Sequence, residues 1–142
     1  MYKQISFAVI FFICLQSKAQ YKNDNVLYKT VYPEDLSQQL KANPGYLLLD
    51  VRSKEENGDT SKMGMNIGHF KNAKNINVNE LGVRINELEN DKNKPIFVYC
   101  SHSQRSRRAS KMLADSGFTK VFNINGGMSA LIQSNYGLND YL

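Results

Sequence analysis

The sequence predicts an α/β domain built on a five-stranded, mainly parallel sheet flanked by helices. Two observations predict this class. First, residues 46–51 and 95–99 are continuous apolar runs, a pattern typical of strands buried on both faces of a parallel sheet. Second, segments with strand character alternate along the chain with segments whose apolar residues recur at helical spacing. This alternation is the order expected when helices connect parallel strands.

The elements follow one another with recognisable local signals. Residues 28–32 are rich in β-favouring side chains and predict a short first strand. Pro33 and the two acids after it begin a helix, because proline is tolerated in the first turn and acids face the positive end of the helix dipole. Apolar residues at helical spacing predict an amphipathic helix over residues 80–90. Another helix begins near Arg105 and ends at Gly117. The remaining elements are strands over residues 73–78 and 121–124 and a short helix over residues 128–132.

Composition is that of one globular domain. The chain has 142 residues, of which 42% are hydrophobic and 22% charged, with nine Gly and three Pro. These values exclude collagen-like, low-complexity and multidomain chains. The formal charge is +5, but two of the lysines lie in the first 19 residues. The remaining positive charge is too small to indicate a nucleic-acid partner.

The first residues predict an export signal. Lys3 precedes an apolar run over residues 5–15. Small residues occupy positions 17 and 19, the two positions that a signal peptidase would recognise before a cleavage site after residue 19. The run is shorter than the roughly 20 apolar residues that a membrane span needs. We therefore expect residues 1–19 to be a cleaved signal peptide, residues 20–27 a flexible arm, and residues 28–142 a single domain.

This signal implies an exported protein, periplasmic in a Gram-negative source, with no membrane attachment after cleavage. The alternatives are a permanent N-terminal anchor and a lipoprotein acylated at Cys14. Acylation is disfavoured because the bulky residues Phe12 and Ile13 precede that cysteine.

Cleavage leaves Cys100 as the sole thiol of the mature chain, so no intramolecular disulfide can form. An unpaired cysteine in an exported protein is either reactive or available for intermolecular pairing. The simpler alternative is a small buried side chain, since free cysteine is among the most buried residue types.

The position of Cys100 favours reactivity. It directly follows an apolar strand, and ligands of open parallel sheets bind beyond the carboxyl ends of strands. Residues 101–106 are all polar and lead into a helix, so their N–H groups can converge on an anion and stabilise a thiolate. Arg105 and two further arginines add positive charge, and no acid occurs between Cys100 and Ala114 to cancel their field.

The loop length indicates which electrophile the thiolate attacks. A thiolate in an anion site can attack an outer sulfur atom or a phosphoryl group. Arg105 is the fifth residue after Cys100, whereas cysteine phosphatases place arginine sixth, a position that Ser106 occupies here. The shorter loop suits a smaller electrophile, which favours sulfur.

Four segments occur in order along the chain: Leu48-Leu49-Asp50-Val51-Arg52, Gly68-His69-Phe70 with Ala73 and Ile76-Asn77-Val78, Val98-Tyr99-Cys100 with Arg105-Ser106, and Asn125-Gly126-Gly127-Met128. Together they resemble the rhodanese family of sulfurtransferases over about residues 31–131. The resemblance implies a single rhodanese domain in which Cys100 takes the sulfane sulfur of thiosulfate or a similar donor. The resulting persulfide would pass sulfur to a thiophilic acceptor such as cyanide or a protein thiol.

The resemblance also implies a role for each residue of the site. Cys100 and Arg105 would be catalytic, while Asp50 and Ser106 would support the loop. The expected substrate contacts come from Ser101, His102, Ser103, Gln104 and Arg52. We expect no cofactor and no metal, a small anionic sulfur donor, a possible protein thiol acceptor, no nucleic acid, and a monomer.

Two departures from the family pattern stand out. Ser103 occupies a position where the family often has glycine, so we expect a positive φ and strain there. The link of 15 residues between Arg52 and Gly68 is longer than usual and could narrow substrate choice or dock a partner. Two alternative functions stay open: a binding or regulatory module without turnover, and a cysteine phosphatase or arsenate reductase-like enzyme.

Overall fold

The computed structural model describes residues 27–61, 67–133, 136, 138 and 140–142. The predicted signal peptide and nearly all of the predicted arm lie outside the described residues, as do residues 62–66 of the long link. Among the residues described, no helix is both long and apolar enough to cross a membrane.

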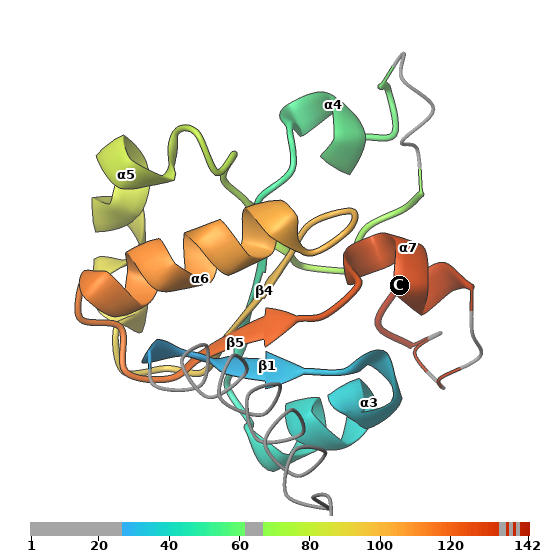
Figure 1. Cartoon of the computed structure of the whole chain (residues 1–142), viewed down its shortest axis with the longest axis horizontal. Helices are drawn as coiled ribbons and strands as arrows, with labels where there is room; N and C mark the ends of the chain where they lie inside the picture. The colour runs from blue at the N-terminus through green and yellow to red at the C-terminus, as the bar shows by residue number, and fades with distance from the viewer. Residues whose placement is uncertain (1–26, 62–66, 134–135, 137, 139) are drawn as a thin grey trace, which may run out of the picture.

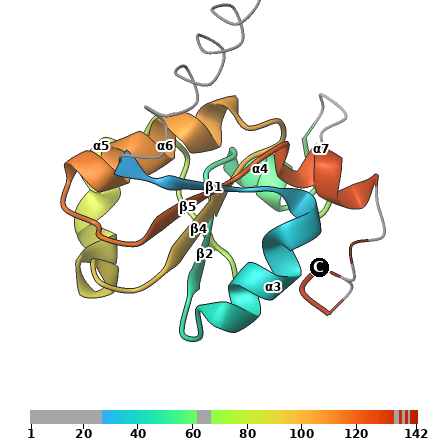
Figure 2. The ribbon, with the colours of Figure 1, turned by 60° about the horizontal axis from the view of Figure 1, so that its bottom comes forward.

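Five strands form one sheet in the order β1-β5-β4-β2-β3. Every pairing is parallel, so the predicted five strands are confirmed and the sheet is wholly rather than mainly parallel. Figure 2 shows β4 in the middle of the sheet, between β5 and β2. The strands are β1 (Lys29–Val31), β2 (Leu47–Asp50), β3 (Lys74–Asn75), β4 (Ile96–Tyr99) and β5 (Val121–Ile124).

Helices cover both faces of the sheet. The helical elements are α3 (Pro33–Ala42), α4 (Lys54–Asn57), α5 (Leu81–Arg84), the 3₁₀ helix η1 (Ile85–Asp91), α6 (Gln104–Asp115) and α7 (Gly127–Ile132). One apolar cluster joins one face of the sheet to α5, η1 and α6, and a second joins the other face to α3 and α7. Figure 1 shows this layering, with α6 and α3 on opposite sides of the strands.

The alternation of side chains explains the two clusters. Val98 of β4 faces the α6 side, whereas Phe97 and Tyr99 face the α3 side. All four residues of β4 are buried, as a strand covered on both faces requires. Cys100, which comes next, is therefore placed at the carboxyl end of the central strand and on the α6 side.

Two helical regions differ from the prediction. The amphipathic helix expected over residues 80–90 is a short α-helix, α5, followed by the 3₁₀ helix η1. Gly82, Val83 and Asn86 have weak helix propensity, so a regular α-helix over this length is not favoured. Its leucines are nevertheless buried at the predicted spacing.

The second difference is α4, which lies in the long polar link between Arg52 and Gly68, where no helix is predicted. The Glu56 N–H donates to Ser53 Oγ over 3.2 Å, and the Glu56 carboxylate accepts from the Ser53 N–H over 3.2 Å. This reciprocal capping box begins a helix even in a polar segment. It also fixes the position of the Glu56 side chain.

Candidate functional site

The loop from β4 to α6 curls around the sulfur of Cys100. The Ser103 N–H donates to Cys100 Sγ over 3.1 Å, and Ser106 Oγ lies 3.6 Å from the same sulfur. Cys100 is a free cysteine and only 1% exposed. The sulfur also lies beside the N-terminus of α6, whose dipole favours negative charge. The Cys100 sulfur is thus buried and at the same time in contact with polar groups of the loop.

Ser103 has the predicted positive φ, at 85°. Its hydroxyl accepts a short hydrogen bond from the Gly126 N–H, and its carbonyl accepts from Ser106 Oγ over 3.0 Å. A side chain in this backbone region costs about 1–2 kcal/mol relative to glycine. The hydroxyl contact offsets that strain by joining the loop to the start of α7.

Substitutions at Ser103 should separate strain from hydrogen bonding. Ser103→Ala keeps the strained backbone and leaves the Gly126 N–H unpaired, whereas Ser103→Gly loses the same bond but releases the strain. We expect the glycine variant to be more stable than the alanine variant by about 1 kcal/mol in urea unfolding. Ser116, whose φ is −91°, is the control, and there alanine should be more stable than glycine. Equal stability of the two Ser103 variants would contradict this account.

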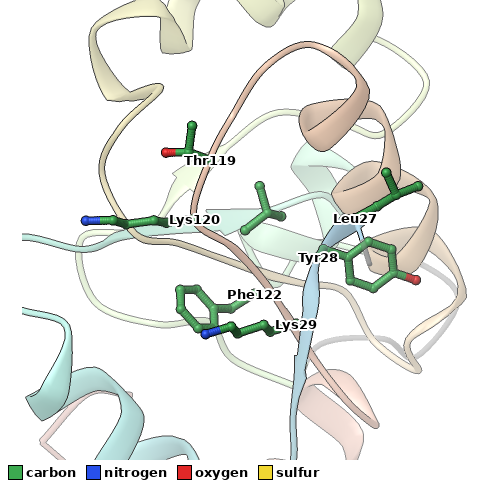
Figure 3. Close-up of a pocket in the computed structure, with 7 residues that line it drawn as sticks. Leu27, Tyr28, Lys29, Thr119, Lys120 and Phe122 are labelled. Carbon is green, nitrogen blue, oxygen red and sulfur yellow. The ribbon is translucent and has the colours of Figure 1, made fainter. Parts of the chain in front are cut away.

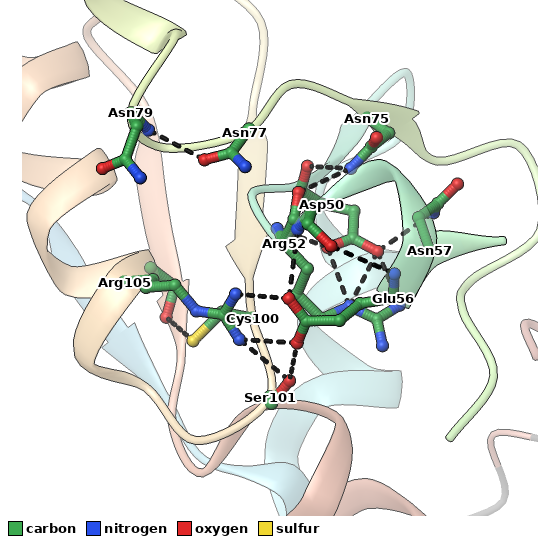
Figure 4. A network of polar contacts seen from close by, with 12 residues as sticks. Asp50, Arg52, Glu56, Asn57, Asn75, Asn77, Asn79, Cys100, Ser101 and Arg105 are labelled. Carbon is green, nitrogen blue, oxygen red and sulfur yellow. Dashed lines mark hydrogen bonds and ion pairs between the residues drawn. The ribbon is translucent and has the colours of Figure 1, made fainter. Parts of the chain in front are cut away.

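Arg105 is paired with an acid that sequence reasoning missed. Its guanidinium binds Glu56 through two contacts, Nη1 to Oε2 at 2.6 Å and Nη2 to Oε1 at 2.8 Å. Ser101 Oγ donates to the same Glu56 Oε1 over 3.0 Å (Figure 4). The expectation that no acid cancels the arginine field is therefore wrong for Arg105. The acid comes from α4, distant in sequence, and its only local signal is the capping box.

The pair remains ionised at neutral pH. The Arg105 hydrogen bond is the main cause that lowers the pKa of Glu56 to about 2, with further lowering by the Ser53 N–H and the Ser101 hydroxyl against the effect of burial. Hydrogen bonding to Glu56 likewise raises the pKa of Arg105. The Glu56 side chain is 10% exposed and that of Arg105 is 35% exposed. A half-buried ion pair thus stands beside the Cys100 loop.

Asp50 and Arg52 form a second, fully buried ion pair beneath the first. Arg52 Nη2 lies 2.6 Å from Asp50 Oδ2, and both side chains are 0% exposed. Asp50 Oδ1 also accepts from the Arg52 N–H over 2.9 Å, and Arg52 Nη2 donates to the Gly68 carbonyl over 2.8 Å. Asn57 of α4 donates to Asp50 over 3.0 Å, which connects the two pairs.

Asp50 accepts hydrogen bonds from Arg52 and Asn57, and its supporting role stays a prediction. The Arg52 guanidinium is directed to Asp50, two residues earlier, and is buried. Its Nη1 has no hydrogen-bond partner among the described residues, and its part in substrate binding stays a prediction.

The remaining predicted site residues lie along the same loop. Ser101 and Ser106 are buried, whereas His102 and Gln104 are exposed. His102 Nε2 lies 3.0 Å from Ser129 Oγ of α7. The structure thus brings Cys100, Ser101, Ser103, Arg105 and Ser106 together and leaves His102 and Gln104 at the rim.

The start of α7 packs directly on the loop. The Met128 N–H donates to the Cys100 carbonyl over 2.8 Å, and the Ser129 N–H donates to the Ser101 carbonyl over 3.1 Å. Gly127, with φ 56°, lies so close that an added Cβ would be 2.2 Å from the Cys100 carbonyl oxygen. Gly126 and Gly127 are therefore both in contact with the Cys100 loop.

Elsewhere in the described residues, we looked for groups of metal ligands and for pockets. Within these residues, no group of three or more His, Cys, Asp or Glu side chains could hold a metal ion. A pocket of about 160 Å³ lies at the amino ends of β1 and β5, with Lys29, Lys120 and Phe122 in its wall (Figure 3). It is at the opposite end of the sheet from Cys100 and contains none of the predicted site residues.

Comparisons with known proteins agree with this architecture. The uncharacterized protein YqhL of Bacillus subtilis (strain 168) is 38% identical over 80 residues, which are 56% of this chain and 56% of that protein. A rhodanese-related protein from Thermoplasma volcanium is 28% identical with a TM-score of 0.59, over 77% of this chain and 95% of that chain. An NAD-dependent persulfide reductase from A. fulgidus is 28% identical with a TM-score of 0.55, over 79% of this chain but only 17% of that chain.

The chain thus spans little more than half of the curated relative and a small part of the reductase. Residues 32–134 match the family described as the rhodanese-like domain, a range that includes both ion pairs and the Cys100 loop. The chain therefore belongs to the rhodanese-like domain family.

Proposed function

We propose that this protein is a sulfurtransferase that carries sulfur as a persulfide on Cys100. The observation that carries the proposal is the environment of Cys100 Sγ, which receives the Ser103 N–H at the N-terminus of α6 and at the carboxyl end of the central strand. Membership of the rhodanese-like family and similarity to a protein named as a persulfide reductase support it.

The reaction divides into two displacements on sulfur. With thiosulfate, the Cys100 thiolate attacks the outer sulfur, the donor's S–S bond breaks, and sulfite leaves with that bond's electron pair. The product is a Cys100 persulfide anion, so the total charge is unchanged. An acceptor such as cyanide or a thiolate then attacks the outer sulfur of the persulfide and restores the Cys100 thiolate.

The start of α6 stabilises negative charge on Cys100 Sγ, because the Ser103 N–H and the α6 dipole act directly on it. Ser106 Oγ donates its proton to the Ser103 carbonyl and accepts from the Cys100 thiol, so it helps to hold the loop around the sulfur. Arg105 lies at the rim, held in place by Glu56 and Ser101.

The intact mass of the purified protein tests the proposal. Treatment with a sulfane donor, either thiosulfate or an alkyl persulfide, should add one sulfur atom, about 32 Da, and cyanide should remove it as thiocyanate. A rhodanese fold kept for binding alone would gain no mass. Failure of both donors to add sulfur would therefore overturn the proposal.

We also propose that the protein acts after export, as a monomer, with a small anionic donor and a protein thiol as acceptor. The signal-like pattern of residues 1–19, which is outside the described residues, supports export. The mass of the chain recovered from the cell envelope of an expressing Gram-negative host tests export. A mature chain that begins at Gln20 would agree, and an uncleaved chain in the cytoplasm would contradict it.

A further inference from the structure

Glu56 changes the charge that a sulfur donor meets at this site. Its carboxylate occupies both Nη atoms of Arg105, the arrangement by which arginine would otherwise bind an anionic donor. Glu56 is itself held by the Ser53 N–H and the Ser101 hydroxyl, so it is not free to swing away. Arg105 and Glu56 together contribute no net charge.

The consequence differs between classes of donor. Thiosulfate is a dianion, and its leaving group, sulfite, carries two negative charges away from the reacting sulfur. An alkyl persulfide brings at most one charge at the sulfur, and its leaving group is a thiolate with a single charge. Because Glu56 neutralises Arg105, the site lacks the attraction that a free arginine would exert, and a dianion such as thiosulfate loses more from this than a persulfide does.

We infer that Glu56 is a specificity-determining residue that selects alkyl persulfides of low charge over dianionic donors such as thiosulfate. The inference rests on the proposed sulfur transfer through Cys100. In the favoured reaction the Cys100 thiolate attacks the terminal sulfur of R–S–SH and the S–S bond breaks. The products are Cys100–S–SH and R–S⁻, which takes a proton from water, so atoms and charge balance.

The substitution Glu56→Gln tests the inference because it removes the charge and keeps the shape. Loading of Cys100 is followed by intact mass with two probes, thiosulfate and 2-hydroxyethyl persulfide, which has no charged group besides its persulfide, to give kcat/KM for each. Wild type should prefer the persulfide. In E56Q the value for thiosulfate should rise about tenfold relative to that for the persulfide, the effect of one nearby charge at intermediate dielectric.

Two further variants separate charge from other effects. Glu55→Gln is the matched control, since Glu55 is the exposed neighbour on the same helix and the change of net charge is identical. Its donor ratio should stay at the wild-type value. Glu56→Asp keeps the charge while shortening its reach to Arg105, and it should still discriminate against thiosulfate.

The outcomes distinguish failure of the proposed sulfur transfer from failure of the inference about Glu56. If neither donor loads any variant, the proposed sulfur transfer itself fails. If both donors load wild type and E56Q with the same ratio, Glu56 does not select the donor, although the transfer stands. A shift in E55Q as large as in E56Q would also overturn the inference, because only net charge would then matter. Unfolding curves of all variants check that each is folded.

Discussion

Cys100→Ala is expected to lose sulfur loading and transfer, with rates at least about 10³-fold below wild type. The sulfur of Cys100 is the atom that forms and breaks bonds in both steps, and no neighbouring side chain can replace it. Ser101, Ser103 and Ser106 offer hydroxyls, which are far weaker nucleophiles toward sulfur. The measurement is thiocyanate release from a sulfane donor and cyanide, together with the intact mass after donor treatment.

The same variant should remain folded. Cys100 packs among apolar residues at the edge of the α6-side cluster, and its replacement by alanine removes only one atom of the side chain. We expect a loss of about 1 kcal/mol in the free energy of unfolding. Ser116→Ala, which also removes one side-chain atom but at the far end of α6, is the matched control and should retain full activity. Transfer by Cys100→Ala at more than about a tenth of the wild-type rate would eliminate the persulfide mechanism.

Gly127→Ala is expected to destabilise the protein by about 3–5 kcal/mol and to distort the Cys100 loop. An added Cβ would lie 2.2 Å from the Cys100 carbonyl oxygen and 2.7 Å from the Ser101 carbonyl carbon. Both are backbone atoms held by the hydrogen bonds from α7, so neither can move aside without moving the loop. The backbone φ of 56° adds strain for any side chain.

Gly45→Ala provides the comparison for this effect. Gly45 also has a positive φ, 78°, but an added Cβ there meets nothing within 4 Å. It should cost only the backbone strain, about 1 kcal/mol. Denaturant unfolding measures both, and sulfur loading reports on the loop. Similar losses in the two variants would show that close packing of α7 on the loop is unimportant.

Local patterns in the sequence were sufficient to predict the strands and the position of Cys100. Burial on both faces makes β2 and β4 continuous apolar runs, and the polar residues after Tyr99 mark the strand end. The positive φ of Ser103 follows from comparison with a family that often has glycine there. The apolar runs and the polar strand ends are properties of residues and their immediate neighbours in the chain.

The parts that escaped prediction depend on contacts between distant segments. Glu56 meets Arg105 only because α4 folds over the end of the sheet, and a four-residue helix has too short an apolar pattern to be recognised. An arginine side chain is well suited to bind an anion, but in the fold Arg52 forms a buried ion pair with Asp50. The strand order likewise follows from packing rather than from any one segment.

That strand order has a consequence for how the chain is made. β1 is synthesised first among the described strands, yet its partner in the sheet is β5, the last: Lys29 pairs with Phe122. β4, which leads into Cys100, also has β5 as one of its two neighbours. Pairing between segments so far apart slows folding, because a long loop must close before the contacts form. A chain in which β5 is not yet available therefore has an incomplete sheet, and the surroundings of Cys100 take shape only after β5 has joined β1 and β4.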